Sequence, residues 1–370
     1  MSSPTAATLQ YPCEACGASV AFEPGSRVLR CGYCGHAQGI PEPTRQVREH
    51  ALDELAVLPR TPVAHLEHLQ VVCPRCGATT TSTHLSQACP FCGAPLVVDT
   101  AASSGALVPD AVLPFGIDRT AARTALVAWT RSRWFAPRAL RSVSTAESVR
   151  GTYVPHWTFD ADTETDYTGQ RGEHYWVTVT TTDSEGRAQS HQEMRTSWHR
   201  AAGTVRRLFD DLLVVATRAL PIRIIRKLEP WPLGDAVPFS PDYLAGHDTL
   251  RYDVEPETGL EEAKAVMARR IEADVRDDIG GDEQRVTSMD TYYRAVTYKL
   301  VLLPAWLAVY VYAGRTFEVA INALTGEVLG ERPWSVVKIV AAVLAVLLVV
   351  LAVVLVVLQE RTGSVLPTGP

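Results

Sequence analysis

The residues best suited to chemistry are eight cysteines, which all lie between residues 13 and 92 and are absent from the 278 residues that follow. They form four C-x-x-C pairs, and the pairs combine into two sets of four. The first set has 14 residues between its pairs and the second has 12. In chain order the eight are Cys13, Cys16, Cys31 and Cys34, then Cys73, Cys76, Cys89 and Cys92.

Paired C-x-x-C motifs at this spacing predict two zinc ribbons. Zn²⁺ prefers four soft ligands in a tetrahedron, about 2.3 Å from each sulfur, and one C-x-x-C turn supplies two of them. A glycine follows the second cysteine of every pair, where a turn with positive φ is needed. Because four thiolates leave no position for water, we expect two structural Zn²⁺ ions and no catalytic one. Nearby histidines (His36, His65, His68 and His84) are expected at the surface.

The start of the chain, "MSSPTAATLQYPCEACG", has neither a basic region nor an apolar stretch and does not resemble a signal peptide. We therefore expect the cysteines in the cytoplasm, where thiols stay reduced and act as metal ligands rather than forming disulfides. Residues 1–100 contain six Arg against eight Asp or Glu. Thiolates bound to zinc make the region more acidic, so nucleic acid is not the expected partner.

A second distinctive stretch, "IVAAVLAVLLVVLAVVLVVL" at residues 339–358, is apolar throughout. At about 1.5 Å per residue, a helix of this length spans about 30 Å of hydrocarbon. Trp334 and Lys338 precede it and are expected at the membrane interface. More basic residues precede the span than follow it, so we expect a single-pass protein of the cell membrane with its N-terminal part in the cytoplasm.

The part of the chain between the cysteines and the apolar segment predicts an α+β domain. A helix is expected from Asp118 through Trp134, and another over "TGLEEAKAVMARRIEADVRDDIGG", ending at Gly280 and Gly281. "RTFEVAINALTGEVLGE" predicts a hairpin turning around Thr325 and Gly326, and "YKLVLLPAWLAVYVYAG" a buried strand pair broken at Pro304.

The predicted fold class is therefore α+β, with two N-terminal four-cysteine zinc ribbons, a central mixed domain and one C-terminal transmembrane helix. The expected segments are ribbon 1 (1–40), a partly helical linker (41–70), ribbon 2 (71–98), a linker (99–111), the cytoplasmic α+β domain (112–333), the transmembrane helix (336–358) and an extracytoplasmic tail (359–370).

Signatures of common enzymes are missing from the sequence. No lysine follows a glycine, which excludes a Walker A phosphate loop, and neither H-E-x-x-H nor G-x-S-x-G occurs. Polar groups in "VPHWTFDADTETD", "HQEMRTSWH" and "LFDDLLV" are compatible with an acid and base pair, and equally with the wet face of a strand. The first holds His156, Asp160 and Asp162, the second His191, Glu193 and His199, and the third Asp210 and Asp211. We expect no enzymatic activity.

Motifs along nearly the whole chain resemble those of bacterial TFIIB-type zinc-ribbon membrane proteins. They include "YPCEACGASVAFEPGSRVLRCGYCG", "CPFCGAPLV", "GTYVPHWTFDADTETDYTGQRGEHY" and "LLPAWLAVYVYAGRTFEVAINALTGEVLGERPWS". Proteins of this family are often named after the primosomal protein N-prime helicase, but the helicase name does not fit a chain without a nucleotide-binding motif. Members resemble components of phage-shock-like membrane-stress modules and accompany SPFH (flotillin-like) and TPM-domain proteins.

Two hypotheses follow. The first is a non-enzymatic, zinc-binding adaptor that is anchored in the membrane, faces the cytoplasm and binds other membrane-associated proteins; the adaptor role and its partners are implied by the resemblance. The second is a membrane-tethered nucleic-acid factor linked to replication or transcription, which would bind in a strongly salt-dependent way.

Overall fold

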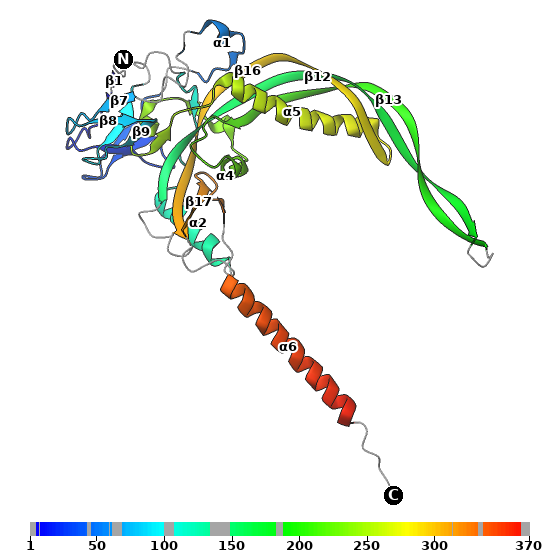
Figure 1. The fold of residues 1–370 in the computed structure, drawn as a ribbon. Coiled ribbons are helices and arrows are strands. Elements are labelled where there is room, and N and C mark those ends of the chain that lie inside the picture. The colour runs from blue at the N-terminus through cyan, green and yellow to red at the C-terminus, as the bar shows by residue number, and fades with distance from the viewer. Residues whose placement is uncertain are drawn as a thin grey trace. The chain divides into compact units, whose positions relative to one another are not determined.

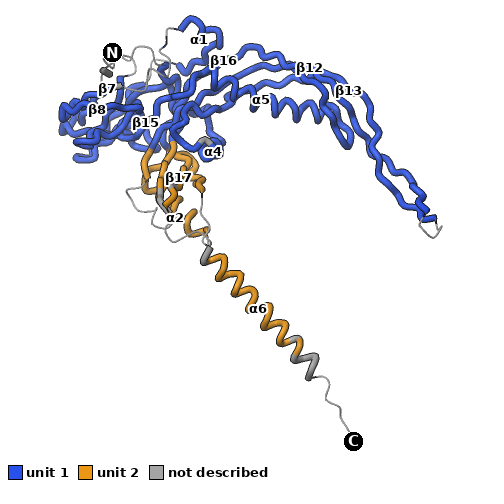
Figure 2. The backbone as a smooth tube through the Cα atoms, in the orientation of Figure 1, with its two compact units in different colours: residues 1–115, 152–304 blue, residues 116–151, 305–370 orange. Residues whose placement is uncertain are grey.

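The computed structural model describes residues 5–6, 8–42, 46–58, 60, 69–99, 107–133, 149–182, 188–312, 314–331 and 336–363. The chain is a sheet-rich α+β protein and divides into two compact units (Figure 2). Unit 1 comprises residues 1–115 and 152–304, and unit 2 comprises residues 116–151 and 305–370. Two of the expectations above, the interfacial Trp334 and the surface positions of His65 and His68, fall outside the described residues.

Unit 1 is built on a mixed sheet. Its strands lie in the order β14 (Val237–Pro238), β11 (Ala111–Val112), β16 (Glu283–Tyr312), β12 (Val149–Thr182), β15 (Asp248–Leu250), β9 (His84–Ala88), β10 (Pro95–Val98) and β2 (Thr8–Leu9). In addition, β13 (Ala188–Val215) pairs with β12, and β6 (His50–Ala51) pairs with β16.

Three long strands dominate this sheet. In Figure 1, β12, β13 and β16 run side by side, with the helix α5 (Pro256–Ile279) along one face. The pairing of β12 with β13 is antiparallel and continuous from His156 to Thr182, except for one register shift between Phe159 and Ala161. Between the two strands the residues from 183 to 187 are not described.

The helix α5 packs through one apolar stripe. Its buried residues repeat at spacings of three and four, which places them on one face. They are Leu260, Ala263, Met267, Ile271, Val275 and Ile279, and they pack on Trp157, Phe159, Tyr167, Phe209 and Leu212 of the sheet. The predicted end of the helix is confirmed, because Gly280 adopts a left-handed φ of 65° there.

Two small sheets flank the cysteines. One has the order β3 (Val20–Phe22), β4 (Val28–Cys31) and β5 (Ala37–Gly39), and the other the order β1 (Thr5–Ala6), β7 (Leu69–Val72) and β8 (Thr79–Ser82). Among the described residues, the remaining elements of unit 1 are short helical turns: α1 (Glu54–Val57), α4 (Ile222–Ile225), and 3₁₀ turns at Arg226–Leu228, Leu233–Asp235 and Pro241–Leu244.

Unit 2 contains α2 (Arg119–Arg131), the end of β16, β17 (Arg315–Asn322), β18 (Val328–Gly330) and α6 (Val336–Gly363). Asp118 caps α2 as predicted, since its carboxylate accepts a hydrogen bond from the Ala121 N–H at 2.7 Å. The helix ends at Arg131, before the predicted end at Trp134, which lies outside the described residues. The hairpin of β17 and β18 turns at Gly326, with a φ of 75°, as predicted.

The prediction of a strand pair broken at Pro304 is wrong. The single strand β16 runs through this proline. On one side of it, β16 pairs with β11 as far as Leu302, and on the other it pairs with β17 from Ala305 onward. Pro304 therefore lies where β16 changes its partner from β11 to β17, and at this position the missing N–H costs no ladder hydrogen bond.

Candidate metal centres

The four C-x-x-C turns share one backbone geometry. In each, the N–H of the glycine that follows the pair donates to the carbonyl of the first cysteine, over 2.8 to 3.0 Å. Those glycines all lie in the left-handed region: Gly17, Gly35 and Gly77 have a φ of 74° and Gly93 one of 69°. A residue with a Cβ is strained at such angles, so the turn explains why glycine recurs four times.

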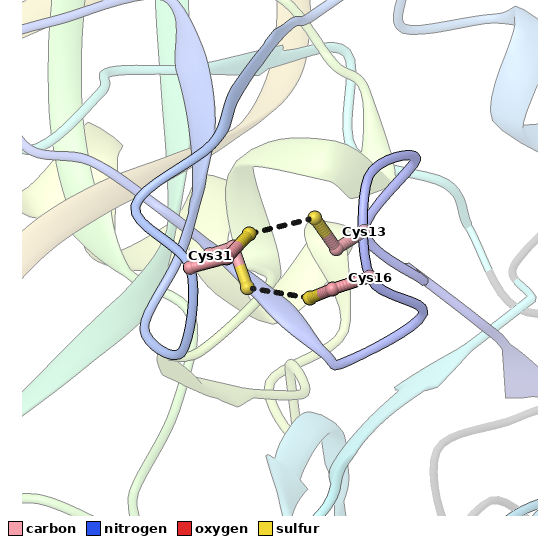
Figure 3. Close-up of side chains that lie close together, drawn as sticks. Cys13, Cys16 and Cys31 are labelled. Carbon is pink, nitrogen blue, oxygen red and sulfur yellow. Dashed lines mark hydrogen bonds between the residues drawn. The ribbon is translucent and has the colours of Figure 1, made fainter.

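The turns bring the sulfurs together in two groups of four. In the first, Cys13 and Cys34 are 3.6 Å apart, as are Cys16 and Cys31; Figure 3 shows Cys13, Cys16 and Cys31 converging. In the second, Cys73 and Cys92 are 3.6 Å apart, and Cys76 and Cys89 3.9 Å. Within each group all four sulfurs lie within 4.8 Å of one another.

These distances fit a metal tetrahedron. Four sulfurs at about 2.3 Å from a central ion are separated by about 3.8 Å. A disulfide would require about 2.05 Å, and none of the eight cysteines forms one. The donor set therefore matches a soft divalent ion with all four positions filled by protein. The sequence prediction of two four-cysteine sites is confirmed at the level of geometry, with the ligands in the predicted sets.

The first cysteine of every pair is buried, and the second is more accessible. Backbone N–H groups of Cys34 and Tyr33 lower the pKa of Cys31 to about 6. Burial raises the pKa of Cys73, but the N–H groups of Cys76 and Arg75 outweigh it and lower that pKa to about 7. At Cys31 and Cys73 the turn thus stabilises the thiolate, which is the form that binds metal. At Cys76 the N–H of Ala78 favours the thiolate too, but burial and the neighbouring thiols outweigh it and raise the pKa to about 11.

The first cluster is anchored to the rest of unit 1 through β3. The Phe22 N–H donates to the Ala245 carbonyl at 2.9 Å, and its ring meets that of Tyr243 edge to face, with centroids 5.3 Å apart. The backbone at Gly246 lies so close to β3 that a Cβ added at Gly246 would be 2.5 Å from the Ala21 Cβ. This cluster is therefore not a free-standing module.

The second cluster is built into the main sheet. Its strand β9 pairs with β15 through Ser86 and Thr249. The Ser86 hydroxyl donates to the His247 carbonyl at 2.7 Å and lies 2.6 Å from the Thr249 hydroxyl. Beneath the sulfurs, a small apolar core contains Val71, Cys73, Cys89, Ala94, Leu96 and Val98.

One feature of both clusters was missed by sequence reasoning. Tyr33 and Phe91 are 86% and 71% exposed, although large aromatic side chains are usually buried. Both occupy the position just before the last cysteine of their set, in "CGYC" and "CPFC". The repeated aromatic at that position was the signal available in the sequence.

Among the polar groups considered for catalysis, the structure brings Asp160 and Asp211 together. His156 is 3% exposed, and its Nδ1 lies 3.0 Å from the Val154 carbonyl. Asp160 accepts hydrogen bonds from the Asp211 N–H and the Thr297 hydroxyl, whereas Asp162 is exposed. His191, Glu193 and His199 are exposed along β13. Within the described residues, the two cysteine sets are the groups of metal-ligating side chains that come together.

The apolar helix predicted near the C-terminus is present as α6. Its window Lys338–Val356 has a mean hydropathy of 3.6, and none of its residues is buried. By length and composition it is able to cross a membrane. The second residue predicted at the interface, Lys338, is the first of this window and is partly exposed.

An uncharacterized bacterial protein is similar to most of this chain. No family model matches the chain, and no solved structure matches it. The chain is similar to the uncharacterized protein YdjG of Bacillus subtilis (strain 168), with 26% identity over 340 residues that cover 90% of this chain and 92% of the relative. The likeness therefore covers most of the chain, without supplying an activity.

Proposed function

We propose that this protein is a non-enzymatic, zinc-binding adaptor, held to the cytoplasmic face of the cell membrane by one transmembrane helix. The observation that carries this proposal is the pair of complete four-cysteine clusters, which are built into one unit of a chain that ends in an exposed apolar helix. Such clusters stabilise a surface rather than activate a water molecule.

Zinc is the proposed metal for both clusters. Tetrahedral sets of four thiolates are typical of structural Zn²⁺ and of iron–sulfur centres, and C-x-x-C pairs with glycine-closed turns are typical of zinc ribbons. In the reducing cytoplasm the thiolates stay available for the metal. When bound, the ion supplies folding free energy, on the order of 10 kcal/mol in small zinc domains.

The exposed aromatics Tyr33 and Phe91 are the proposed contacts with a partner protein. Each stands on a turn fixed by two metal ligands, so little conformational entropy is lost when it docks. Aromatic side chains are enriched among the residues that dominate binding energy at interfaces. The adaptor would thus present two rigid aromatic contacts, one on each cluster.

Charge defines the kind of partner. Residues 1–100 carry six Arg and eight Asp or Glu, and each zinc with four thiolates adds a charge of about −2. This balance favours a basic protein surface over nucleic acid, whose binding depends on Lys and Arg. The family resemblance directs the search to SPFH-type and TPM-domain proteins of the same membrane, and to membrane stress as the process.

The test uses the full-length protein purified from native membranes with its bound partners. Tyr33→Ala and Phe91→Ala, singly and together, should reduce partner recovery in quantitative mass spectrometry while two zinc ions per chain remain. The exposed Tyr292 on β16 provides a matched control, because Tyr292→Ala removes a similar side chain away from both clusters.

Unchanged recovery with the double variant would refute docking through the aromatics. If the wild-type protein instead retains RNA or DNA with a steep salt dependence, the nucleic-acid hypothesis replaces the adaptor. Metal analysis that finds iron instead of zinc would refute the assignment of the metal alone.

A further inference from the structure

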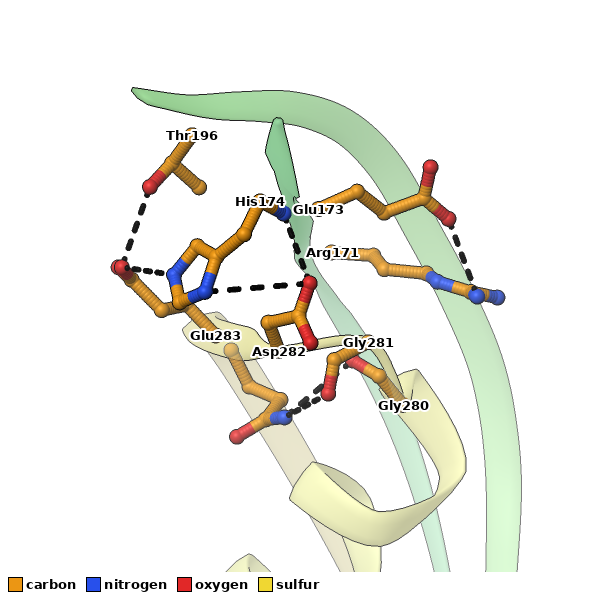
Figure 4. Close-up of polar contacts among 9 residues, drawn as sticks. Arg171, Glu173, His174, Thr196, Gly280, Gly281, Asp282 and Glu283 are labelled. Carbon is orange, nitrogen blue, oxygen red and sulfur yellow. Dashed lines mark hydrogen bonds and ion pairs between the residues drawn. The ribbon is translucent and has the colours of Figure 1, made fainter. Parts of the chain in front are cut away.

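The hairpin formed by β12 and β13 extends beyond Glu283, the first residue of β16. The strand β16 begins at Glu283, and the turn before it closes against β12, as Figure 4 shows. There the Asp282 N–H donates to the Gly172 carbonyl at 2.9 Å, and the His174 N–H donates to the Asp282 carboxylate at 2.7 Å. Beyond His174, no described strand lies along this edge of β12.

The backbone groups on that edge can be identified from the alternation of a strand. The Gly172 carbonyl and the His174 N–H both point toward Asp282, in the turn that precedes β16, and the register with β13 is unbroken from there to Thr182. Because alternate residues point to the same edge, Trp176, Thr178, Thr180 and Thr182 present their N–H and C=O groups on it as well.

This edge lacks the features that normally protect a free strand. Tyr175–Thr182, with the sequence "YWVTVTTT", has neither a charge nor a proline, and its residues favour strands. The neighbouring strand β13 differs, since it carries His191, Glu193 and Arg195 opposite the same stretch. A long, uncharged edge rich in strand-forming residues is a template for another strand.

The side chains also indicate an interface. Trp176 is 65% exposed and lies opposite Met194, which is half exposed, so the two form an apolar pair on one face of the hairpin. A two-stranded hairpin is marginally stable in water, and three or more strands are needed for independent stability. Both the open edge and the apolar pair would be stabilised by additional strands.

We propose that two copies of this chain associate through this edge, with their β12 strands paired antiparallel into one four-stranded sheet. A second copy fits because the edge is uncharged and matches itself under two-fold symmetry, without like-charge repulsion. A charged partner strand would find no complementary charge between Tyr175 and Thr182.

In one register, the backbone groups of all four edge residues, Trp176, Thr178, Thr180 and Thr182, form hydrogen bonds with the partner subunit. Trp176 then pairs with Thr182 of the partner subunit, and Thr178 with Thr180 of the partner subunit, which gives about eight backbone hydrogen bonds. The two-fold axis passes through Val179, which faces Val179 of the partner subunit. That position is a non-hydrogen-bonded pair, with Cα atoms about 4.5 Å apart.

The test is disulfide crosslinking of the full-length protein in its membrane. Val179→Cys should form a reducible dimer of twice the 40.4 kDa chain mass under mild oxidation, since its Cα spacing suits a disulfide. Val177→Cys is the matched control, because this register places it opposite Thr181 of the partner subunit and far from its own copy. The wild-type protein controls for the eight native cysteines.

A second variant tests the non-covalent dimer. Thr178→Pro removes an N–H on the open edge but none that bonds β13, so the dimer should be lost in sedimentation analysis while the chain stays folded. Thr178→Val keeps the N–H and should keep the dimer. Absence of the Val179→Cys crosslink, or a dimer unaffected by Thr178→Pro, would overturn the proposal.

A membrane contact is the alternative outcome. If a polarity-sensitive dye on Trp176→Cys shifts with anionic vesicles while the Val179→Cys protein remains monomeric, the edge binds lipid and the proposal fails. The proposal does not depend on the metal sites, so its failure would leave the proposed adaptor function unaffected.

Discussion

The ammonium group of Lys299, on β16, lies 2.6 Å from the carboxylate of Asp211, on β13. It also lies 2.9 Å from Glu49, in a segment predicted as a linker. Asp211 adopts a left-handed φ of 51°, and its N–H donates to Asp160. One buried cation thus holds together two strands and the chain between the cysteine clusters.

Replacing Lys299 should destabilise unit 1. Burial lowers the pKa of Lys299, but its contacts with Asp211 and Glu49 outweigh that effect and raise it, so the ammonium is retained. Lys299→Met leaves both carboxylates without their cation and should reduce the free energy of unfolding by about 2 kcal/mol, measured with urea. Lys264→Met, which removes an exposed pair with Glu261, should cost less than about 0.5 kcal/mol. Equal effects of the two substitutions would contradict this assignment.

Replacing a glycine of the cysteine turns should weaken metal binding, because a side chain at a positive φ strains the backbone. A Cβ added at Gly17 would have no atom within 4 Å, but the φ of Gly17 is 74°, which strains any residue with a side chain. Gly17→Ala should therefore cost about 1 to 2 kcal/mol, or roughly tenfold or more in zinc affinity measured by competition with a chelator. Gly39 is equally open but has no positive φ, so Gly39→Ala should leave the affinity unchanged.

Removing the metal should loosen more than the cysteine loops. Because β9 pairs with β15 and Ser86 bonds to His247, chelation should increase hydrogen exchange at residues 247–250. The amides of α5, which packs on the other strands, should keep their protection at the same chelator concentration. Unchanged exchange at 247–250 after complete metal loss would show that the sheet holds this segment by itself.

Stability should fall as the pH drops below 6.5. Burial lowers the pKa of His156 to about 4, so the unfolded chain binds a proton at a pH where the folded chain does not. The stability present above pH 6.5 is then lost toward pH 4, by up to about 1.4 kcal/mol per pH unit for this histidine. His156→Asn should reduce that slope in urea titrations between pH 7 and pH 5. His191→Asn, at an exposed position, is the control substitution.

The proposed orientation can be tested with tags at the two ends of the chain. A C-terminal tag should be reached by an antibody on intact cells, whereas an N-terminal tag should require permeabilisation. The reverse pattern would place the cysteine clusters in an oxidising compartment and contradict the zinc assignment. Both tags inside would exclude a single crossing by α6.

Local patterns predicted several elements correctly because the signal lies within a few residues. The cap at Asp118, the stripe of α5 and the turn at Gly326 are examples, and the cysteine spacing identified both sites. The path of β16 through Pro304 was not predictable, since it depends on where β11 ends and β17 begins. Equally, nothing near Glu49 in the sequence indicates Lys299, which lies 250 residues further along.

The segment between Tyr243 and Leu250 contacts both cysteine clusters. Ala245 accepts from Phe22 of the first cluster, and His247 accepts from Ser86 of the second. A ligand that orders this segment from one side lowers the entropy cost of ordering it from the other, and such coupling is reciprocal. The two metal ions should therefore bind with positive cooperativity, which would give the folded protein a steep, threshold-like response to the free metal concentration.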